Sequence, residues 1–153
     1  DKYNKLNFVQ LCINVALLRR KECIIMEKLQ MICQLLDDKK AIDITLVELT
    51  DLTVIADYFV ICSARSNTQV KALSDIVEEG MSKVGVEPLR VEGKQEGRWA
   101  VLDYGDVIVH IFYEETRRLY SLENLWSNGA NVTHYGVDSE DAFKKLQSES
   151  KLV

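Results

Sequence analysis

Apolar residues recur along this chain at two spacings, which predict helices and strands in turn. Over residues 26–36, 70–81 and 114–126 they return every three or four positions, which places them on one side of a helix. Ser66 and Asn67 precede the second of these helices, and either side chain can accept a hydrogen bond from the free amides of its first turn. We therefore expect three main helices, each with one apolar side turned toward a core.

Other segments alternate apolar and polar residues or are apolar throughout, as strands do. Strands are expected at residues 41–46, 57–62, 86–91, 99–104 and 107–112. The run Asp57–Cys62 is almost wholly apolar, which is typical of a strand covered on both faces. Gly105 and Asp106 separate the last two strands by the two residues of a tight β-hairpin. This order of elements predicts an α/β (α+β) fold with a mixed sheet of about five strands flanked by helices.

The two ends of the chain differ from the middle. Residues 1–25 include an apolar stretch that is too short and too often interrupted by polar residues to span a bilayer. They form either an extra amphipathic helix or a translated leader. The leader is suggested by Lys21-Glu22, which can be encoded by AAGGAG, a bacterial ribosome-binding sequence, shortly before Met26. The divisions we expect are a domain over residues 26–132 and a variable C-terminal extension over residues 133–153, with a short helix at residues 138–146.

The charges of the chain bear on its partners. It has 24 acidic and 19 basic residues and a formal net charge of -5. A protein that grips bare nucleic acid usually presents a basic face, so direct recognition of DNA or RNA is not expected. If this protein works beside nucleic acid, its acidic balance favours contact with a basic protein there.

The cysteines and histidines are too few and too scattered for a metal site. The cysteines are Cys12, Cys23, Cys33 and Cys62, and the histidines are His110 and His134. No pair of cysteines has the C-x-x-C spacing of zinc ligands. We expect reduced thiols in a cytoplasmic protein, without a metal or a cofactor, and we interpret Cys62 as a packing residue and not as a nucleophile.

Three motifs occur in an order and spacing that characterise one family. The first is Asp57-Tyr58-Phe59-Val60-Ile61-Cys62, followed by Ser63, Ser66, Gln69, Val70 and Ala72. The second is Glu92-Gly93 with the run from Trp99 to Phe112, and the third comprises Glu115, Arg117, Leu119-Tyr120, Leu122-Glu123 and Leu125-Trp126. Together they resemble the Iojap, or ribosomal silencing factor, family across residues 28–132. The sequence departs from the family pattern at Ala64, where glycine or threonine is common, and at Arg118, which adds a charge.

The resemblance implies a fold and a function. Members of the family resemble nucleotidyltransferases in fold but are not known for that chemistry. They bind the large ribosomal subunit through its ribosomal protein fourteen, block association with the small subunit and repress translation when nutrients are short. They also affect large-subunit biogenesis, homodimers occur among them, and relatives serve in chloroplasts and mitochondria. By this resemblance we expect a bacterial, cytoplasmic regulator of translation that is not an enzyme and has no membrane partner.

The residues expected to bind the partner lie mainly on the hairpin. Trp99, Val101 and Asp103 alternate onto one face of their strand. A tryptophan on a sheet face belongs either to the core or to an interface, and the family resemblance favours the interface here. Six positions separate Arg117 from Glu123, so we expect them on different sides of one helix, paired with other elements or with the partner. The full set of expected partner-binding residues is Trp99, Val101, Asp103, Tyr104, Asp106, Arg117 and Glu123.

Two other functions stay open on the residues alone. A nucleotidyltransferase-like enzyme would need a Gly-Ser turn to cradle phosphate and paired carboxylates to hold magnesium. Ser63–Ser66 lacks the glycine, and Asp103 and Asp106 stand on either side of a hairpin tip instead of at alternate positions of one strand. His110 is either a buried, hydrogen-bonded histidine or, with these carboxylates, an acid–base group, but no nucleophile motif accompanies it. The other alternative, an RNA-binding module, is opposed by the acidic balance.

Overall fold

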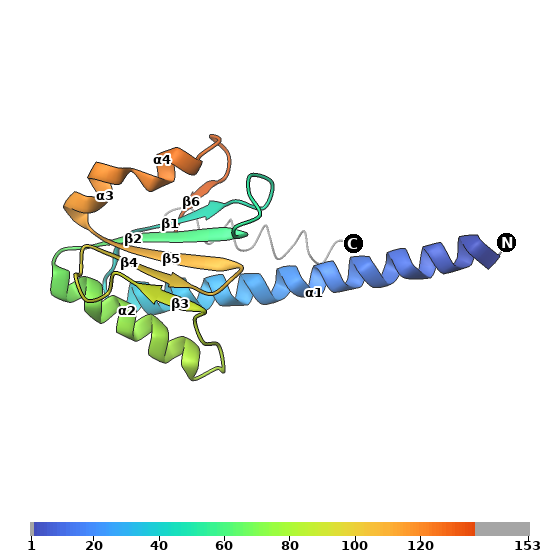
Figure 1. Ribbon diagram of the computed structural model, residues 1–153, viewed down its shortest axis with the longest axis horizontal. Helices are drawn as coiled ribbons and strands as arrows, with labels where there is room; N and C mark the ends of the chain where they lie inside the picture. The colour runs from blue at the N-terminus through green and yellow to red at the C-terminus, as the bar shows by residue number, and fades with distance from the viewer. Residues whose placement is uncertain (1, 137–153) are drawn as a thin grey trace.

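Six strands form one mixed sheet in the computed structural model of this protein, which describes residues 2–136 (Figure 1). The strands are β1 (Ile42–Glu48), β2 (Tyr58–Ala64), β3 (Arg90–Glu92), β4 (Trp99–Asp103), β5 (Val107–Tyr113) and β6 (Val132–His134). Their order across the sheet is β3-β4-β5-β2-β1-β6, with β2 and β5 parallel and the other neighbours antiparallel. The mixed sheet and the β4–β5 hairpin are confirmed.

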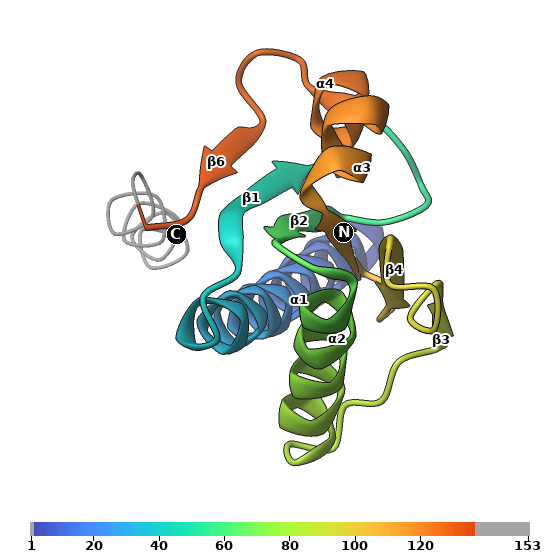
Figure 2. The same cartoon turned by 90° about the vertical axis from the view of Figure 1, so that its left-hand side faces the viewer.

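Two helices, α1 (Lys2–Asp38) and α2 (Asn67–Ser82), cover one face of the sheet, which we call the helix-covered face (Figure 2). Ser66 caps α2 as predicted, since its Oγ accepts the Gln69 N–H at 3.1 Å. The apolar residues buried on this face include Leu29, Ile32 and Leu36 from α1, Val70, Leu73 and Val77 from α2, and Val60, Leu102 and Val109 from the sheet. This aliphatic layer is the main core of the protein.

The first helix continues well beyond the sheet on its N-terminal side (Figure 1). Among the residues of α1 whose side chains the structure describes, Ile25 is the first that is buried, and none of residues 9–24 is buried. The start of the chain is thus helical from Lys2, but the side chains of residues 9–24 pack little against the sheet. No helix in the described part of the chain is long and apolar enough to cross a membrane.

Two elements differ from the sequence-based expectations. The strand expected at residues 86–91 shrinks to β3, because the Val86 N–H closes the end of α2 on the Met81 carbonyl and Pro88 has no N–H for a sheet. The helix expected over residues 114–126 is broken into α3 (Glu114–Tyr120) and α4 (Leu122–Trp126). Ser121 stands between them in the left-handed conformation, with φ 45°, and the change of direction this produces is not visible in the apolar spacing.

The sixth strand was not expected. β6 pairs antiparallel with β1 in the register Val47↔Val132 and Thr45↔His134, and it continues past residue 132, where we expected the domain to end. A three-residue edge strand is too short to show a recognisable alternation. The helix expected at residues 138–146 lies outside the described residues.

Candidate partner-binding surface

The second face of the sheet is only partly covered, by α3 and α4 (Figure 2). Its buried residues form a smaller cluster: Val47, Leu49, Ala56, Phe59, Ile61, Ile108 and Phe112. On β4 the alternation is as predicted, because Trp99, Val101 and Asp103 turn to this second face. All three are half-buried, and nothing among the described residues covers them completely.

Aromatic rings are concentrated on this second face, which we call the aromatic face. The Trp99 ring stacks on Phe112 with centroids 4.8 Å apart and lies 5.1 Å from Tyr120 of α3. His110 lies beside them, and its ring meets Phe59 edge-on at 4.6 Å. Trp99 also donates its indole N–H to His110 Nδ1 at 3.1 Å. The half-buried tryptophan is thus held by rings from β5 and α3.

Exposed apolar side chains border the aromatic face. Leu119 and Leu125, on α3 and α4, are 79% and 75% exposed. The β1–β2 loop adds Val54 and Ile55, also exposed, and the neighbouring Ala56 packs into the cluster of the aromatic face. Half-buried aromatic rings with exposed apolar side chains on the surrounding elements are typical of a surface that a partner covers.

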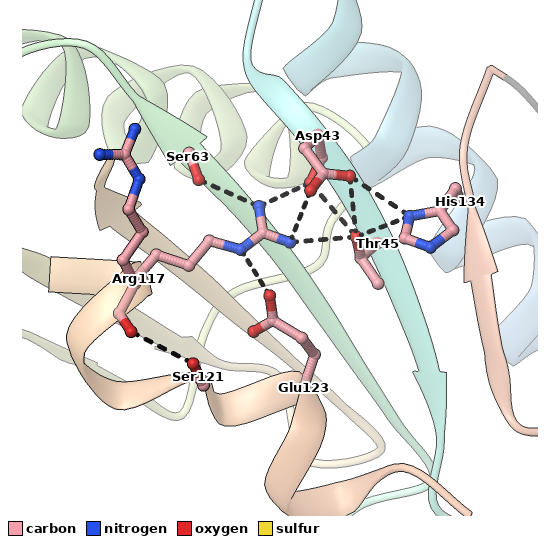
Figure 3. Close-up of polar contacts among 8 residues, drawn as sticks. Asp43, Thr45, Ser63, Arg117, Ser121, Glu123 and His134 are labelled. Carbon is pink, nitrogen blue, oxygen red and sulfur yellow. Dashed lines mark hydrogen bonds and ion pairs between the residues drawn. The ribbon is translucent and has the colours of Figure 1, made fainter. Parts of the chain in front are cut away.

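A buried arginine holds α3 and α4 in place (Figure 3). Arg117 is 6% exposed, and its Nε contacts Glu123 Oε1 at 3.0 Å. The guanidinium also donates to the Asp43 carbonyl at 2.7 Å, to Ser63 Oγ at 3.0 Å and to Thr45 Oγ1 at 3.1 Å. The expectation that Arg117 and Glu123 lie apart was wrong, because the helix break between them turns α4 back toward Arg117.

The same network reaches the edge strand β6. Asp43 lies in a β-bulge of β1 with φ 48°, and its carboxylate contacts Arg117 Nη2 at 3.3 Å. His134 of β6 lies 3.3 Å from the same carboxylate (Figure 3). The arginine therefore joins three strands, β1, β2 and indirectly β6, to the two helices that border the aromatic face.

The other hairpin residues occupy different surroundings. Tyr104 is buried in the core of the helix-covered face, and burial raises its pKa to about 12. Asp106, in the turn, pairs with Lys28 of α1 at 2.8 Å, whereas Asp103 accepts the Gly105 N–H at 2.8 Å. Of the seven residues expected to bind the partner, the structure gathers Trp99, Val101 and Asp103 on one half-open surface. It places Arg117 and Glu123 behind that surface and Tyr104 and Asp106 on the other side.

Sequence reasoning missed three of the residues that complete the aromatic face. Tyr120, Leu119 and Leu125 lie in the third motif, and the structure leaves all three side chains exposed on α3 and α4. The one available signal was that five of the eight residues 119–126 are apolar, more than one side of a helix buries. Such an excess predicts exposed apolar surface without saying which residues provide it.

In the described part of the chain, the side chains that could take part in catalysis are either too dispersed to hold a metal ion or buried. Within residues 2–136 no group of three or more histidine, cysteine, aspartate or glutamate residues could hold a metal ion. Burial raises the pKa of Cys62 to about 12, so its thiol stays protonated, in keeping with a packing role. Burial also lowers the pKa of His110 to about 4, so its ring is neutral at pH 7.

Comparison with known proteins places the chain in a family. Residues 24–152 match the family model described as "Ribosomal silencing factor during starvation". The ribosomal silencing factor RsfS of Halalkalibacterium halodurans is 37% identical over 74% of this chain and 97% of its own length, and that of Bacillus subtilis is 38% identical over 60% and 78%. A mouse protein named "Mitochondrial assembly of ribosomal large subunit protein 1" is 30% identical over 65% of this chain and 45% of its own length.

Solved structures agree with the sequence comparison. A crystal structure of a protein from Chromobacterium violaceum matches with a TM-score of 0.64 and 33% identity, over 65% of this chain and 83% of that one. Another, from Bacillus halodurans, matches with a TM-score of 0.61 and 36% identity, over 65% and 93%. Both the motifs and the fold lead to the same assignment: this chain belongs to the ribosomal silencing factor family.

Proposed function

We propose that this protein binds the large ribosomal subunit through ribosomal protein fourteen, blocks association with the small subunit and thereby represses translation. The names of its bacterial relatives refer to ribosomal silencing, and the mouse relative is named for assembly of the large subunit. We include a role in large-subunit biogenesis and a location in the bacterial cytoplasm in this proposal. The observation that carries it is the half-open aromatic face with its border of exposed leucines.

The aromatic face has the composition of a protein interface. Tryptophan and tyrosine contribute large contact areas at interface centres, and here Trp99 and Tyr120 lie together, while α3 and α4 also expose Leu119 and Leu125. The net charge of -5 favours a basic partner, as ribosomal proteins are. Self-association through the same face is the competing use of such a surface, so homodimerisation has to be measured alongside ribosome binding.

We propose further that the protein acts by binding and not by catalysis. Asp103 and Asp106, which a nucleotidyltransferase would need side by side, are bonded to different elements, the hairpin turn and α1. Direct recognition of RNA is not part of the proposal, given the acidic balance of the chain. Magnesium-dependent turnover of a nucleoside triphosphate that is abolished in Asp103→Asn would contradict the proposal that the protein is not a catalyst.

The test is binding to purified large subunits by co-sedimentation. A tryptophan at an interface centre contributes ~2 kcal/mol or more, so Trp99→Ala should weaken binding by roughly thirtyfold. Leu125→Ser should also weaken binding, with little loss of stability because this side chain is already exposed. Val84→Ser, an exposed apolar residue that follows α2, is the matched control and should bind normally.

Each part of the proposal can fail separately. Full-strength binding by folded Trp99→Ala and Leu125→Ser would show that the aromatic face is not the interface. If the wild-type protein does not reduce the fraction of joined ribosomes when subunits are mixed, it does not block association. Sedimentation equilibrium of the free protein and of Trp99→Ala would show whether the same face also makes a homodimer.

A further inference from the structure

One hydrogen bond within the aromatic face joins an exposed ring to a buried one. Trp99 of β4 donates its indole N–H to Nδ1 of His110 of β5 at 3.1 Å. In the antiparallel register Trp99 lies opposite Phe112 and Val101 lies opposite His110, so the bonded pair is diagonal across the hairpin. His110 is 6% exposed, whereas Trp99 is only half-buried. The bond therefore anchors a surface side chain to a residue inside the fold.

This contact determines the protonation of the histidine. An indole nitrogen can only donate, so His110 Nδ1 must present a lone pair. The proton of the neutral imidazole then lies on Nε2. That Nε2 is buried and has no hydrogen-bond partner among the described residues. The neighbouring rings of Phe59 and Phe112 offer it no conventional acceptor.

A histidine in these surroundings is unfavourable for packing alone. An unpaired N–H buried among apolar rings destabilises the folded state, and an aliphatic residue would avoid this. What the histidine provides in return is the acceptor for Trp99. A residue that lowers the stability of the fold is expected at a functional surface, where it has a role other than packing.

We propose that His110 is a positioning residue of the partner-binding surface, which holds the Trp99 ring in one orientation by accepting its indole N–H. This rests on the proposed function in that Trp99 is taken to contact the partner. Because the one polar atom of the Trp99 side chain is used inside the protein, its exposed part offers only carbon atoms and a π system. The partner group that Trp99 fits is therefore an apolar side chain or the cation of an arginine or lysine, and not a hydrogen-bond acceptor.

The free protein provides the first test. The chain has two tryptophans, so its ¹H–¹⁵N spectrum has two indole signals, which Trp99→Phe assigns. His110→Leu removes the acceptor, and we expect the Trp99 indole signal to shift and its hydrogen exchange to accelerate while the Trp126 signal stays in place. His110→Asn can offer its Oδ1 where Nδ1 was, and should keep Trp99 protected. Val109→Ala, a buried residue on the same strand facing the other way, is the matched control for lost stability.

The second test is a double-mutant cycle in large-subunit binding. A hydrogen bond of ordinary net strength corresponds to about threefold to tenfold in affinity, and His110→Leu should weaken binding by that factor. In the Trp99→Ala background the same substitution should have no further effect, because the histidine acts through the tryptophan.

The two tests separate the inference from the function on which it rests. Unchanged exchange of the Trp99 indole in His110→Leu, or an equal loss of binding with and without Trp99, would overturn the positioning role. Full binding by Trp99→Ala would instead overturn the proposed interface. In that case the indole signals of the free protein still decide whether His110 orients Trp99.

Discussion

The two faces of the sheet are stabilised in different ways. On the helix-covered face, aliphatic residues of α1 and α2 interlock with those of the strands, and nearly all of them are fully buried. On the aromatic face, two short helices leave β4 half-exposed, and a buried arginine attaches them to the sheet beside a smaller set of apolar contacts. The first arrangement is what folding alone favours. The second leaves apolar and aromatic side chains exposed, as a surface that binds a partner does.

The difference has an energetic side. Apolar burial stabilises the fold in proportion to the area removed from water, whereas a buried ion pair contributes little net stability but is very costly to break from one side. Placing such a network under α3 and α4 fixes their geometry without covering the rings beside them. We therefore expect substitutions on the two faces to separate stability from binding.

The largest effect is expected for Arg117→Ala. Removing the guanidinium leaves Glu123 and the polar groups around it buried without their donor, which costs ~3–5 kcal/mol in the free energy of unfolding. The helices α3 and α4 lose their polar attachment to β1 and β2, so large-subunit binding should fall as well. Arg118→Ala is the matched control: this side chain is exposed, and its loss should cost less than ~0.5 kcal/mol. Denaturant melts of both variants, beside co-sedimentation, provide the measurement.

Leu29→Ala should destabilise the protein without harming the aromatic face. Leu29 is fully buried between α1 and the sheet, and truncating such a residue costs ~2–5 kcal/mol. At a temperature where the variant is still folded, binding should equal that of the wild type. Leu18→Ala, on the exposed part of the same helix, should leave both stability and binding unchanged. A binding defect in folded Leu29→Ala would mean that the two faces are coupled.

Acid should lower the stability of the folded protein, partly through His110 on the aromatic face. The pKa of His110 is about 4 in the folded protein, against the ordinary value of 6.5, because burial disfavours its charge. Above pH 6.5 the residue is neutral in both states, and between pH 6.5 and 4 only the unfolded chain gains the proton. Stability therefore falls as the pH falls through this range, by up to about 3 kcal/mol. His110→Asn cannot titrate, so its stability, measured by denaturant melts across this range, should fall less steeply with pH than that of the wild type.

The smallest effect is expected from deleting residues 1–24. The described side chains of this segment, residues 9–24, are not buried, and Ile25 is the first described residue of α1 to enter the core. The melting temperature and large-subunit binding should therefore stay close to those of the full chain, within ~0.5 kcal/mol in stability. A clear loss of either property would assign the segment a role that its packing does not show.

Local patterns in the sequence determined much of the fold. The spacing of apolar residues predicted α2, and Ser66 was recognisable as its cap because capping needs only a short polar side chain before the first turn. The alternation over residues 99–103 predicted which side chains share a face, and Gly105-Asp106 marked the hairpin. The three motifs also pointed to the family. All of these features depend on residues close together in the chain, where periodicity and turn chemistry suffice.

Only the tertiary structure decided what meets across the sheet. The parallel pairing of β2 with β5 and the addition of β6 beside β1 are choices among strand orders that local spacing does not distinguish. The turn of the chain at Ser121, with φ 45°, brings Glu123 back to Arg117, which the six-residue spacing in an uninterrupted helix would not do. The diagonal contact of Trp99 with His110 likewise requires the hairpin register. These contacts are set by the burial of whole elements against one another, and that is a property of the assembled sheet, not of any one segment.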